Sequence, residues 1–262
     1  MNFPIYLHVG RLSLADILEY RVDNIIRIGR YVLTISFALF LWIAIGTETT
    51  ITEINIQELI SYYVAAMIIY GTSNYHLDYI ERDIRLGYMS KYLTKPVSAF
   101  WYYFAHQGTV ALYDVIVKSI LFLPFLAVMS SFSVTLLLKM SIVTLLLIVT
   151  FATTFSLYYC FSSLAFWFQQ VDSLRMTLLF LGRYLSGMII PFYFFPEWAQ
   201  KLLWWSPFPH YAYTPIGLLQ NRVSIESALQ GLFILSCWGV LFYFTSRYIW
   251  RYATHAYEGT GI

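Results

Sequence analysis

The stretch VTLLLKMSIVTLLLIVTFATTFSLYYCFSSLAFWF, residues 134–168, contains a single charged side chain, Lys139. A helix needs about 20 mostly apolar residues to cross a bilayer, so this stretch is long enough to do so. The composition agrees: 59% hydrophobic and 11% charged residues leave too little polar surface to cover a soluble globule of 262 residues. The sequence therefore predicts an all-α integral membrane protein.

Five further apolar runs are also long enough to cross a bilayer. Together they predict a single transmembrane domain over residues 1–262 with six transmembrane helices, near residues 27–46, 57–75, 99–129, 134–168, 176–195 and 228–250.

Lysine and arginine are concentrated in every second loop. One set of segments holds Arg11, Arg21, Arg27, Arg30, Arg82, Arg85, Lys91, Lys95, Arg175, Arg247 and Arg251. The complementary set holds only Lys201 and Arg222. Because short loops rich in Lys and Arg stay on the cytoplasmic side, both termini are predicted to be cytoplasmic (N-in/C-in) in a multi-pass protein of the cytoplasmic (inner) membrane. These cations mark membrane edges, so the net charge of +2 does not point to a nucleic-acid partner.

Residues 13–29 predict an N-terminal interfacial helix. Apolar residues fall on one side at helical spacing and charged residues on the other, and Ser13 followed by Asp16 resembles a capping box that starts a helix. The charged face is poorly suited to hydrocarbon, which favours a helix lying along the membrane surface and in contact with lipid. A simple extension of the first span is the alternative.

The loop at 76–97 is the largest polar insertion between spans. Ile80 and Ile84 repeat at helical spacing, and Gly87 is placed to end the helix. The charged residues around this apolar side are Asp78, Glu81, Arg82, Asp83 and Arg85. Such an amphipathic helix is suited to docking a soluble partner, and a solvated helix that touches nothing is the alternative.

The segment GMIIPFYFFPEWAQKLLWWSPFPHYAYTPIGLL, residues 187–219, carries five of the eight prolines in the chain. No continuous helix tolerates that density, so an outer re-entrant segment that lines or caps a cavity is predicted. An aromatic belt that anchors an exposed loop is the alternative. Its candidate gate residues are Pro191, Pro196, Trp198, Trp205, Pro207 and Pro209.

Three charged residues inside the predicted spans are candidate functional residues. Asp114 and Lys118 lie four residues apart on one helix face, a spacing that lets them neutralise each other; a functional role in the membrane is the other reading. Arg183 lies one or two turns into the fifth run, where it faces an inner cavity or anchors a membrane edge. The five histidines show no metal-ligand spacing, so no metal site is predicted.

Two stretches together resemble the six-span permease subunits of ABC exporters of the type-2 class. They are IRLGYMSKYLTKPVSAFWYY, residues 84–103, and the proline-rich segment 187–219. The basic stretch, Gly, Tyr-Leu and Lys-Pro before the third span are similar to that family's cytoplasmic loop. The Ile-Pro, Phe-Phe-Pro-Glu-Trp and Pro-Phe-Pro series is similar to its outer re-entrant region.

The resemblance implies a dimer of permeases, identical or paired with a related chain, each docked on a cytoplasmic ABC ATPase. The helix around residues 78–87 would be its coupling helix, and residues 187–219 an outer gate for an amphipathic cargo such as a lipid, glycan, peptide or drug. The sequence has no G-x-x-x-x-G-K-[ST] phosphate loop. ATP and Mg²⁺ are therefore expected in the partner ATPase, with no cofactor on this chain and no enzyme activity of its own.

Two other functions are weighed against this one. A carrier driven by an ion gradient would use Asp114 and Lys118 as a relay, but no inverted repeat supports it. A transferase acting on lipid would need an acid or nucleophile cluster, and none is recognisable.

Overall fold

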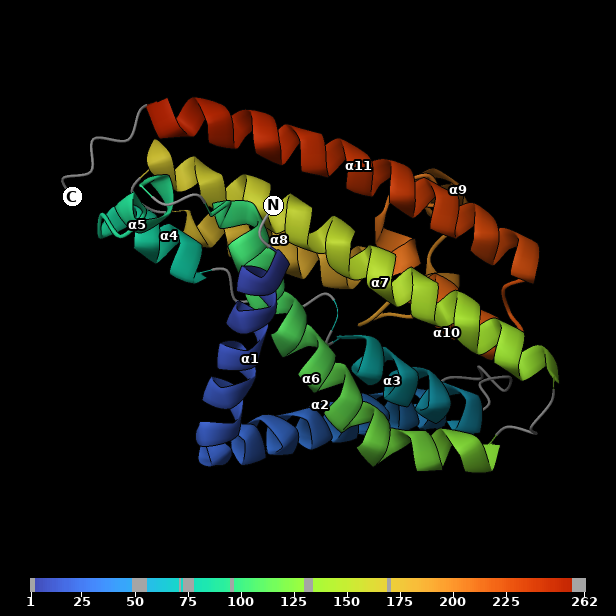
Figure 1. The fold of residues 1–262 in the computed structure, drawn as a ribbon. Helices are drawn as coiled ribbons and strands as arrows, with labels where there is room; N and C mark the ends of the chain where they lie inside the picture. The colour runs from blue at the N-terminus through green and yellow to red at the C-terminus, as the bar shows by residue number, and fades with distance from the viewer. Residues whose placement is uncertain are drawn as a thin grey trace.

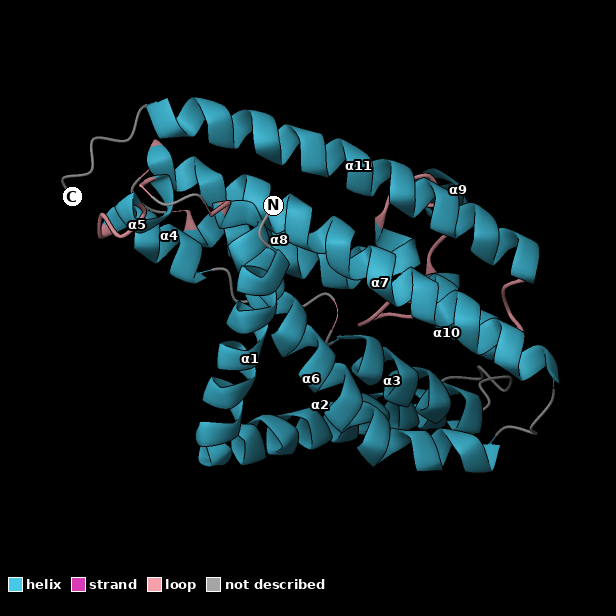
Figure 2. Cartoon of the chain, in the orientation of Figure 1, coloured by secondary structure: helices cyan, strands magenta, loops and turns pink. Residues whose placement is uncertain are grey.

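The computed structural model describes residues 3–48, 56–70, 72, 78–94, 97–129, 134–168 and 171–255. Within these ranges every regular element is a helix, which confirms the predicted all-helical class (Figure 2). The α-helices are α1 (Phe3–Glu19), α2 (Arg21–Glu48), α3 (Ile56–Tyr70), α4 (Asp78–Arg85), α5 (Ser90–Leu93), α6 (Ala99–Met129), α7 (Val134–Ser162), α8 (Asp172–Leu185), α9 (Glu197–Leu203), α10 (Tyr213–Leu219) and α11 (Ile225–His255). Three short 3₁₀ turns are η1 (Ser163–Phe166), η2 (Phe192–Phe194) and η3 (Phe208–Tyr211).

The two long apolar helices α7 and α11 pack along each other over most of their length (Figure 1). Gly239 of α11 allows the close approach, because a Cβ there would lie 2.6 Å from Oγ1 of Thr153. Among the described residues, Thr135–Phe166 and Ile225–Thr254 are long and apolar enough to cross a membrane. These two segments fall in the fourth and sixth predicted spans.

The helices run between two ends of the molecule (Figure 1). One end holds α4, α5 and the C-terminal end of α11, and it is called the α4 end below. The opposite end holds α9, α10, the C-terminal end of α6 and the N-terminal end of α7.

Helix α1 crosses the direction of α2, α7 and α11 (Figure 1) and packs on α6. Gly10 makes this contact close, since a Cβ there would lie 2.9 Å from Oγ1 of Thr109. The predicted helix start at Ser13 is wrong: the helix begins at Phe3, and the Ser13 hydroxyl donates to the carbonyl of Val9 at 2.9 Å. Its buried hydroxyl thus binds backwards within α1 and does not cap a helix.

The predicted helix over 13–29 is also divided in two at Tyr20, between α1 and α2. The side-chain amide of Asn24 donates to the carbonyl of Ile17 at 2.6 Å, which satisfies a backbone group at the end of α1. Residues 13–19 of the amphipathic segment therefore lie in α1, whereas residues 21–29 are continuous with the first long apolar helix, α2.

Four of the other predicted runs match helices closely. The run 99–129 coincides with α6, and 134–168 corresponds to α7 followed by η1. The runs 27–46 and 228–250 lie within α2 and α11. For the run 57–75, α3 covers the residues up to Tyr70, and residues 71 and 73–75 lie outside the described part.

The fifth run, 176–195, is wrong as a single helix. Helix α8 ends at Leu185, Gly187 adopts φ +83°, and Pro191 begins a non-helical turn before η2. A left-handed glycine followed by proline ends a helix, because neither residue favours its continuation. About 14 helical residues rise only ~21 Å, less than a bilayer core, so α8 alone is too short to span one.

Candidate functional site

Helix α4 divides its charged side chains between two sides. Arg82 and Arg85 are exposed, whereas Glu81 is 2% and Asp83 7% exposed, beside the buried Ile80. The sequence placed Glu81 and Asp83 with the other charged residues around the apolar side of this helix. In the structure these two carboxylates instead point into the protein. The side chain of Asp78, the first residue of α4, lies outside the described part.

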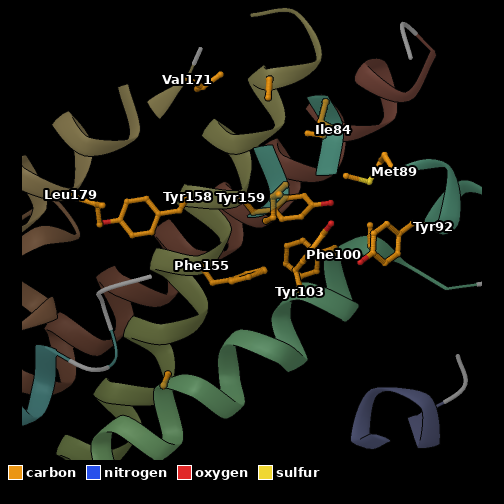
Figure 3. Close-up of a cluster of buried hydrophobic side chains, with 14 residues drawn as sticks. Ile84, Met89, Tyr92, Phe100, Tyr103, Phe155, Tyr158, Tyr159, Val171 and Leu179 are labelled. Carbon is orange, nitrogen blue, oxygen red and sulfur yellow. The ribbon is translucent and has the colours of Figure 1, made fainter. Parts of the chain in front are cut away.

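Asp83 binds α4 to α6. The Tyr103 hydroxyl donates to Oδ2 of Asp83 at 2.8 Å, and Tyr103 itself is 1% exposed. Its ring belongs to a cluster of aromatic side chains that includes Tyr92, with ring centroids 5.3 Å apart, and Phe100 (Figure 3). A buried carboxylate needs such donors, which is why Asp83 faces inward.

Replacing Asp83 with alanine is therefore expected to lower the free energy of unfolding by about 1–3 kcal/mol, because it removes the acceptor of a buried hydroxyl. Asp83→Asn retains an oxygen acceptor at the same place and should restore most of the loss. Unfolding in detergent, followed by circular dichroism, measures both variants. Equal losses for alanine and asparagine would contradict the role given to this hydrogen bond.

Glu81 binds α4 to the beginning of α8. Its Oε1 accepts the backbone N–H of Val171 at 3.4 Å, directly before α8 begins, and lies 3.9 Å from Nε of Arg85. The N-terminal end of a helix favours negative charge, so the site suits a buried carboxylate. The two inward carboxylates of α4 thus contact two different helices.

The end of α4 follows the sequence prediction. Gly87 adopts φ +74°, and its N–H donates to the carbonyl of Ile84 at 3.2 Å. Glycine takes this left-handed conformation without steric cost, so it ends the helix and turns the chain toward α5.

Asp114 and Lys118 form an ion pair within α6. Nζ of Lys118 lies 2.6 Å from Oδ2 of Asp114. The Lys118 side chain is 1% exposed and the Asp114 side chain is 13% exposed. The pair predicted from the four-residue spacing is therefore present and buried inside the protein.

The backbone carbonyls at the break of α8 are bound by two tyrosines of α3. The Tyr62 hydroxyl donates to the carbonyl of Gly187 at 2.6 Å, and the Tyr63 hydroxyl donates to that of Ile189 at 2.8 Å. Buried backbone carbonyls that leave a helix need other hydrogen-bond donors. These hydrogen bonds supply the required partners. The adjacent Tyr pair inside an apolar run was the only sequence signal for them.

Arg183 lies one turn before this break, partly exposed. It lines a cavity of about 10 Å³ with residues of α7, α8 and η3. The structure does not bring Arg183 together with the pair on α6 in any described contact.

The proposed gate residues, which all lie in segment 187–219 (called the outer region below), fall into two groups. Pro191, Pro207 and Pro209 are buried. Pro196, Trp198 and Trp205 are exposed, the two tryptophans by 71% and 64%. The outer region is therefore packed into the protein on one side, and it presents aromatic side chains on the other.

His210 fixes the buried side of the outer region. Its Nε2 lies 2.9 Å from the carbonyl of Trp204, and Nδ1 lies 2.9 Å from Oγ1 of Thr214. Only a protonated Nε2 can donate to the carbonyl, which assigns Nδ1 as the acceptor of the neutral ring. His210 is fully buried, and burial disfavours a charged ring, in agreement with this neutral assignment.

Charged groups near α10 were not singled out from the sequence. Arg222 pairs with Glu58 of α3, and its guanidinium carbon lies 4.3 Å from the centroid of the Tyr193 ring. The hydrogen bond to Glu58 raises the pKa of Arg222. Gln220 also donates to the carbonyl of Glu58 at 2.8 Å, so the loop before α11 is tied to the start of α3.

Within the described ranges, no three His, Cys, Asp or Glu side chains lie close enough to hold a metal ion.

One of the comparisons with known proteins, the one with family models, gives a match over nearly the whole chain. No curated protein matches the sequence. The sequence model of the family described as ABC-2 family transporter protein matches residues 31–261, which include every helix from α3 to α11. This family comprises membrane permease components of ABC transporters, which associate with an ABC ATPase. The chain therefore belongs to the ABC-2 transporter family.

Proposed function

We propose that the chain is the six-span permease subunit of an ATP-driven exporter in the cytoplasmic membrane. Helices α2, α6, α7 and α11 each cross the bilayer, the run 57–75 that begins with α3 forms a fifth crossing, and α8 with the outer region forms the sixth. Both termini and α4 lie on the cytoplasmic side. The clustering of Lys and Arg in the segments at the α4 end supports this orientation.

The exposed surface supports embedding in lipid. Large apolar side chains are exposed along the long helices, among them Phe37 by 72%, Ile148 by 59% and Phe244 by 64%. A soluble monomer rarely exposes contiguous apolar area of this extent. The same surfaces serve lipid contact and pairing with a second copy or a related permease chain.

The division of charge on α4 carries the proposal that this helix is the coupling helix. Its inward carboxylates hold α6 and α8, while its exposed side presents Arg82 and Arg85. An ATPase that binds ATP and Mg²⁺ docks on this basic side. Its closure on ATP displaces α4 only if the two states of the partner contact α4 differently.

The hydrogen bonds of α4 give that displacement a route. Through Asp83 it reaches Tyr103 and α6, and through Glu81 it reaches the start of α8. Helix α8 leads directly into the break at Gly187 and the outer region. Movement of α4 therefore shifts the outer gate and exposes an amphipathic cargo to the other side of the membrane.

Reversing one charge on α4 tests this function. Arg82→Glu is expected to reduce the amount of ABC ATPase that co-purifies with the chain by about tenfold or more. The reason is that a partner surface that binds the basic side of α4 would repel the new carboxylate. Arg251→Glu, at an exposed position near the end of α11, makes the same charge reversal at the α4 end and should leave the ATPase bound. Equal recovery with both variants, or equal loss, would exclude α4 as the docking helix.

A further inference from the structure

The exposed face of α11 changes in character along the helix. Over its first two thirds this face carries large apolar side chains, each more than half exposed: Phe233, Val240, Leu241 and Phe244. Nearer the α4 end it carries two tyrosines and two exposed arginines (Figure 1): Tyr248 and Tyr252, exposed by 65% and 63%, with Arg247 and Arg251. The face thus passes from apolar to aromatic and basic within one helix.

These side chains lie on one side of α11. Phe244, Tyr248 and Tyr252 follow one another at a spacing of four residues, which places them within about 80° around the helix axis. By the same geometry, Arg251 lies about 20° and Arg247 about 60° from Phe244. The rings of the two tyrosines are in contact, with centroids 5.4 Å apart. A molecule lying along this side therefore meets apolar side chains over most of its length and the arginines at one end.

The two arginines bring like charges together. Arg247 and Arg251 are four residues apart on the helix, a spacing at which equal charges repel. None of the ion pairs in the described part of the chain involves either of them. The group that interacts electrostatically with Arg247 is the hydroxyl of Tyr159, which is uncharged at neutral pH. An anion from outside the chain would relieve this repulsion and accept hydrogen bonds from both guanidinium groups.

The apolar part of the face indicates where that anion comes from. From Phe233 to Phe244 the helix rises about 16 Å, close to half of the roughly 30 Å hydrocarbon core of a bilayer. Tyrosine is enriched where hydrocarbon meets water, and arginine beside it reaches the head groups. The face therefore matches one leaflet in depth, with the arginines at the level of the head groups. A free phosphate ion would use the arginines and leave the apolar side chains uncovered.

We propose that Arg247 and Arg251, beside Tyr248 and Tyr252, bind the head group of an anionic phospholipid whose acyl chains lie along the apolar part of α11. This inference rests on the proposed embedding of the chain in a membrane. With the proposed orientation, the lipid belongs to the cytoplasmic leaflet, where basic side chains attract anionic lipids. The site is separate from α4, because it faces lipid and needs no ATPase.

Lipid binding to the full-length chain in neutral detergent, without ATPase or nucleotide, tests the site. Native mass spectrometry with dioleoyl phosphatidylglycerol and dioleoyl phosphatidylcholine should show that the anionic lipid binds about tenfold more tightly or better. Replacing one arginine with glutamine is expected to weaken phosphatidylglycerol binding about fivefold, and Arg247→Gln with Arg251→Gln about 25-fold. Phosphatidylcholine binding should stay unchanged, which also shows that the variant is folded. Arg247→Lys with Arg251→Lys keeps both charges and should retain most of the preference.

The control is Lys201→Gln, which removes an 81% exposed cation of the outer region and should leave the preference unchanged. Equal binding of the two lipids by the natural chain would overturn the site. So would a preference that survives the double glutamine variant, or one that is lost in the lysine or Lys201→Gln variants. A change of oligomeric state with unchanged lipid preference would assign the face to a second copy of the chain instead. Substitution at Arg251 should change the lipid preference and not the recovery of the ATPase, so failure of this site and failure of docking at α4 are distinguishable.

Discussion

Replacing Lys118 with methionine is expected to lower the free energy of unfolding by about 3–5 kcal/mol, because it leaves the Asp114 carboxylate without its buried counter-charge. The ammonium and carboxylate lie 2.6 Å apart, and Lys118 is only 1% exposed. Replacing both residues, Asp114→Leu with Lys118→Met, should recover most of the loss, since no charge then stays buried. Unfolding in mixed micelles measures the three proteins.

The control for this prediction is Lys201→Met, at an 81% exposed position, which should change stability by no more than about 0.5 kcal/mol. A double variant that remains as unstable as Lys118→Met would contradict the structural role of the pair. It would show that one of the two charges has a partner elsewhere that matters more.

The same double variant separates the proposed exporter from a carrier driven by an ion gradient. The exporter assigns no proton step to Asp114 or Lys118, so the chain alone should give no proton flux in liposomes under an imposed pH gradient. A flux in the natural chain that disappears in the double variant would favour the ion-gradient carrier. An internal pH-sensitive dye provides the measurement.

Length and hydropathy were enough to locate most of the fold. Helix α6 begins and ends where the apolar run does, because a bilayer-length run flanked by polar loops leaves few alternatives. Gly87 ended α4 as predicted, since the glycine lies directly after the periodic residues. The i,i+4 spacing also sufficed for the pair on α6.

Contacts between distant segments could not be predicted in the same way. Glu81 and Asp83 point inward because Val171 and Tyr103, far along the chain, supply their donors. On a helical wheel these carboxylates look like surface charges. The start of α1 was missed for a related reason, because Ser13 looks like a cap although its hydroxyl binds within a longer helix.

The break in α8 shows the limit of hydropathy most clearly. Residues 176–195 are apolar enough to suggest one helix, yet the chain turns at Gly187. Such a turn requires partners for the carbonyls that leave the helix, and Tyr62 and Tyr63 belong to a different predicted span. No property of residues 176–195 alone could reveal those partners.

Substituting valine at Gly187 is expected to lower the free energy of unfolding by about 2–5 kcal/mol. The residue adopts φ +83°, where an L side chain costs about 1–2 kcal/mol and a β-branched one is strongly disfavoured. Its Cβ would lie 3.0 Å from Oη of Tyr62 and 3.1 Å from the backbone nitrogen of Phe192, and such overpacking adds about 1–3 kcal/mol. Thermal unfolding in detergent, with amide hydrogen exchange over residues 186–195, measures the loss and locates it.

Gly29→Ala is the matched control for the valine variant. Nothing lies within 4 Å of a Cβ at this helical position, so alanine should stabilise α2 by about 0.5–1 kcal/mol through its higher helix propensity. If Gly187→Val instead unfolds like the natural chain, the turn does not need its left-handed glycine, and the Tyr62 hydrogen bond does not hold the outer region in place. The variant should also still recover the ABC ATPase, because α4 keeps its own contacts with α6 and the start of α8. Retained ATPase binding with a loosened outer region would therefore separate docking at one end of the permease from gating at the other.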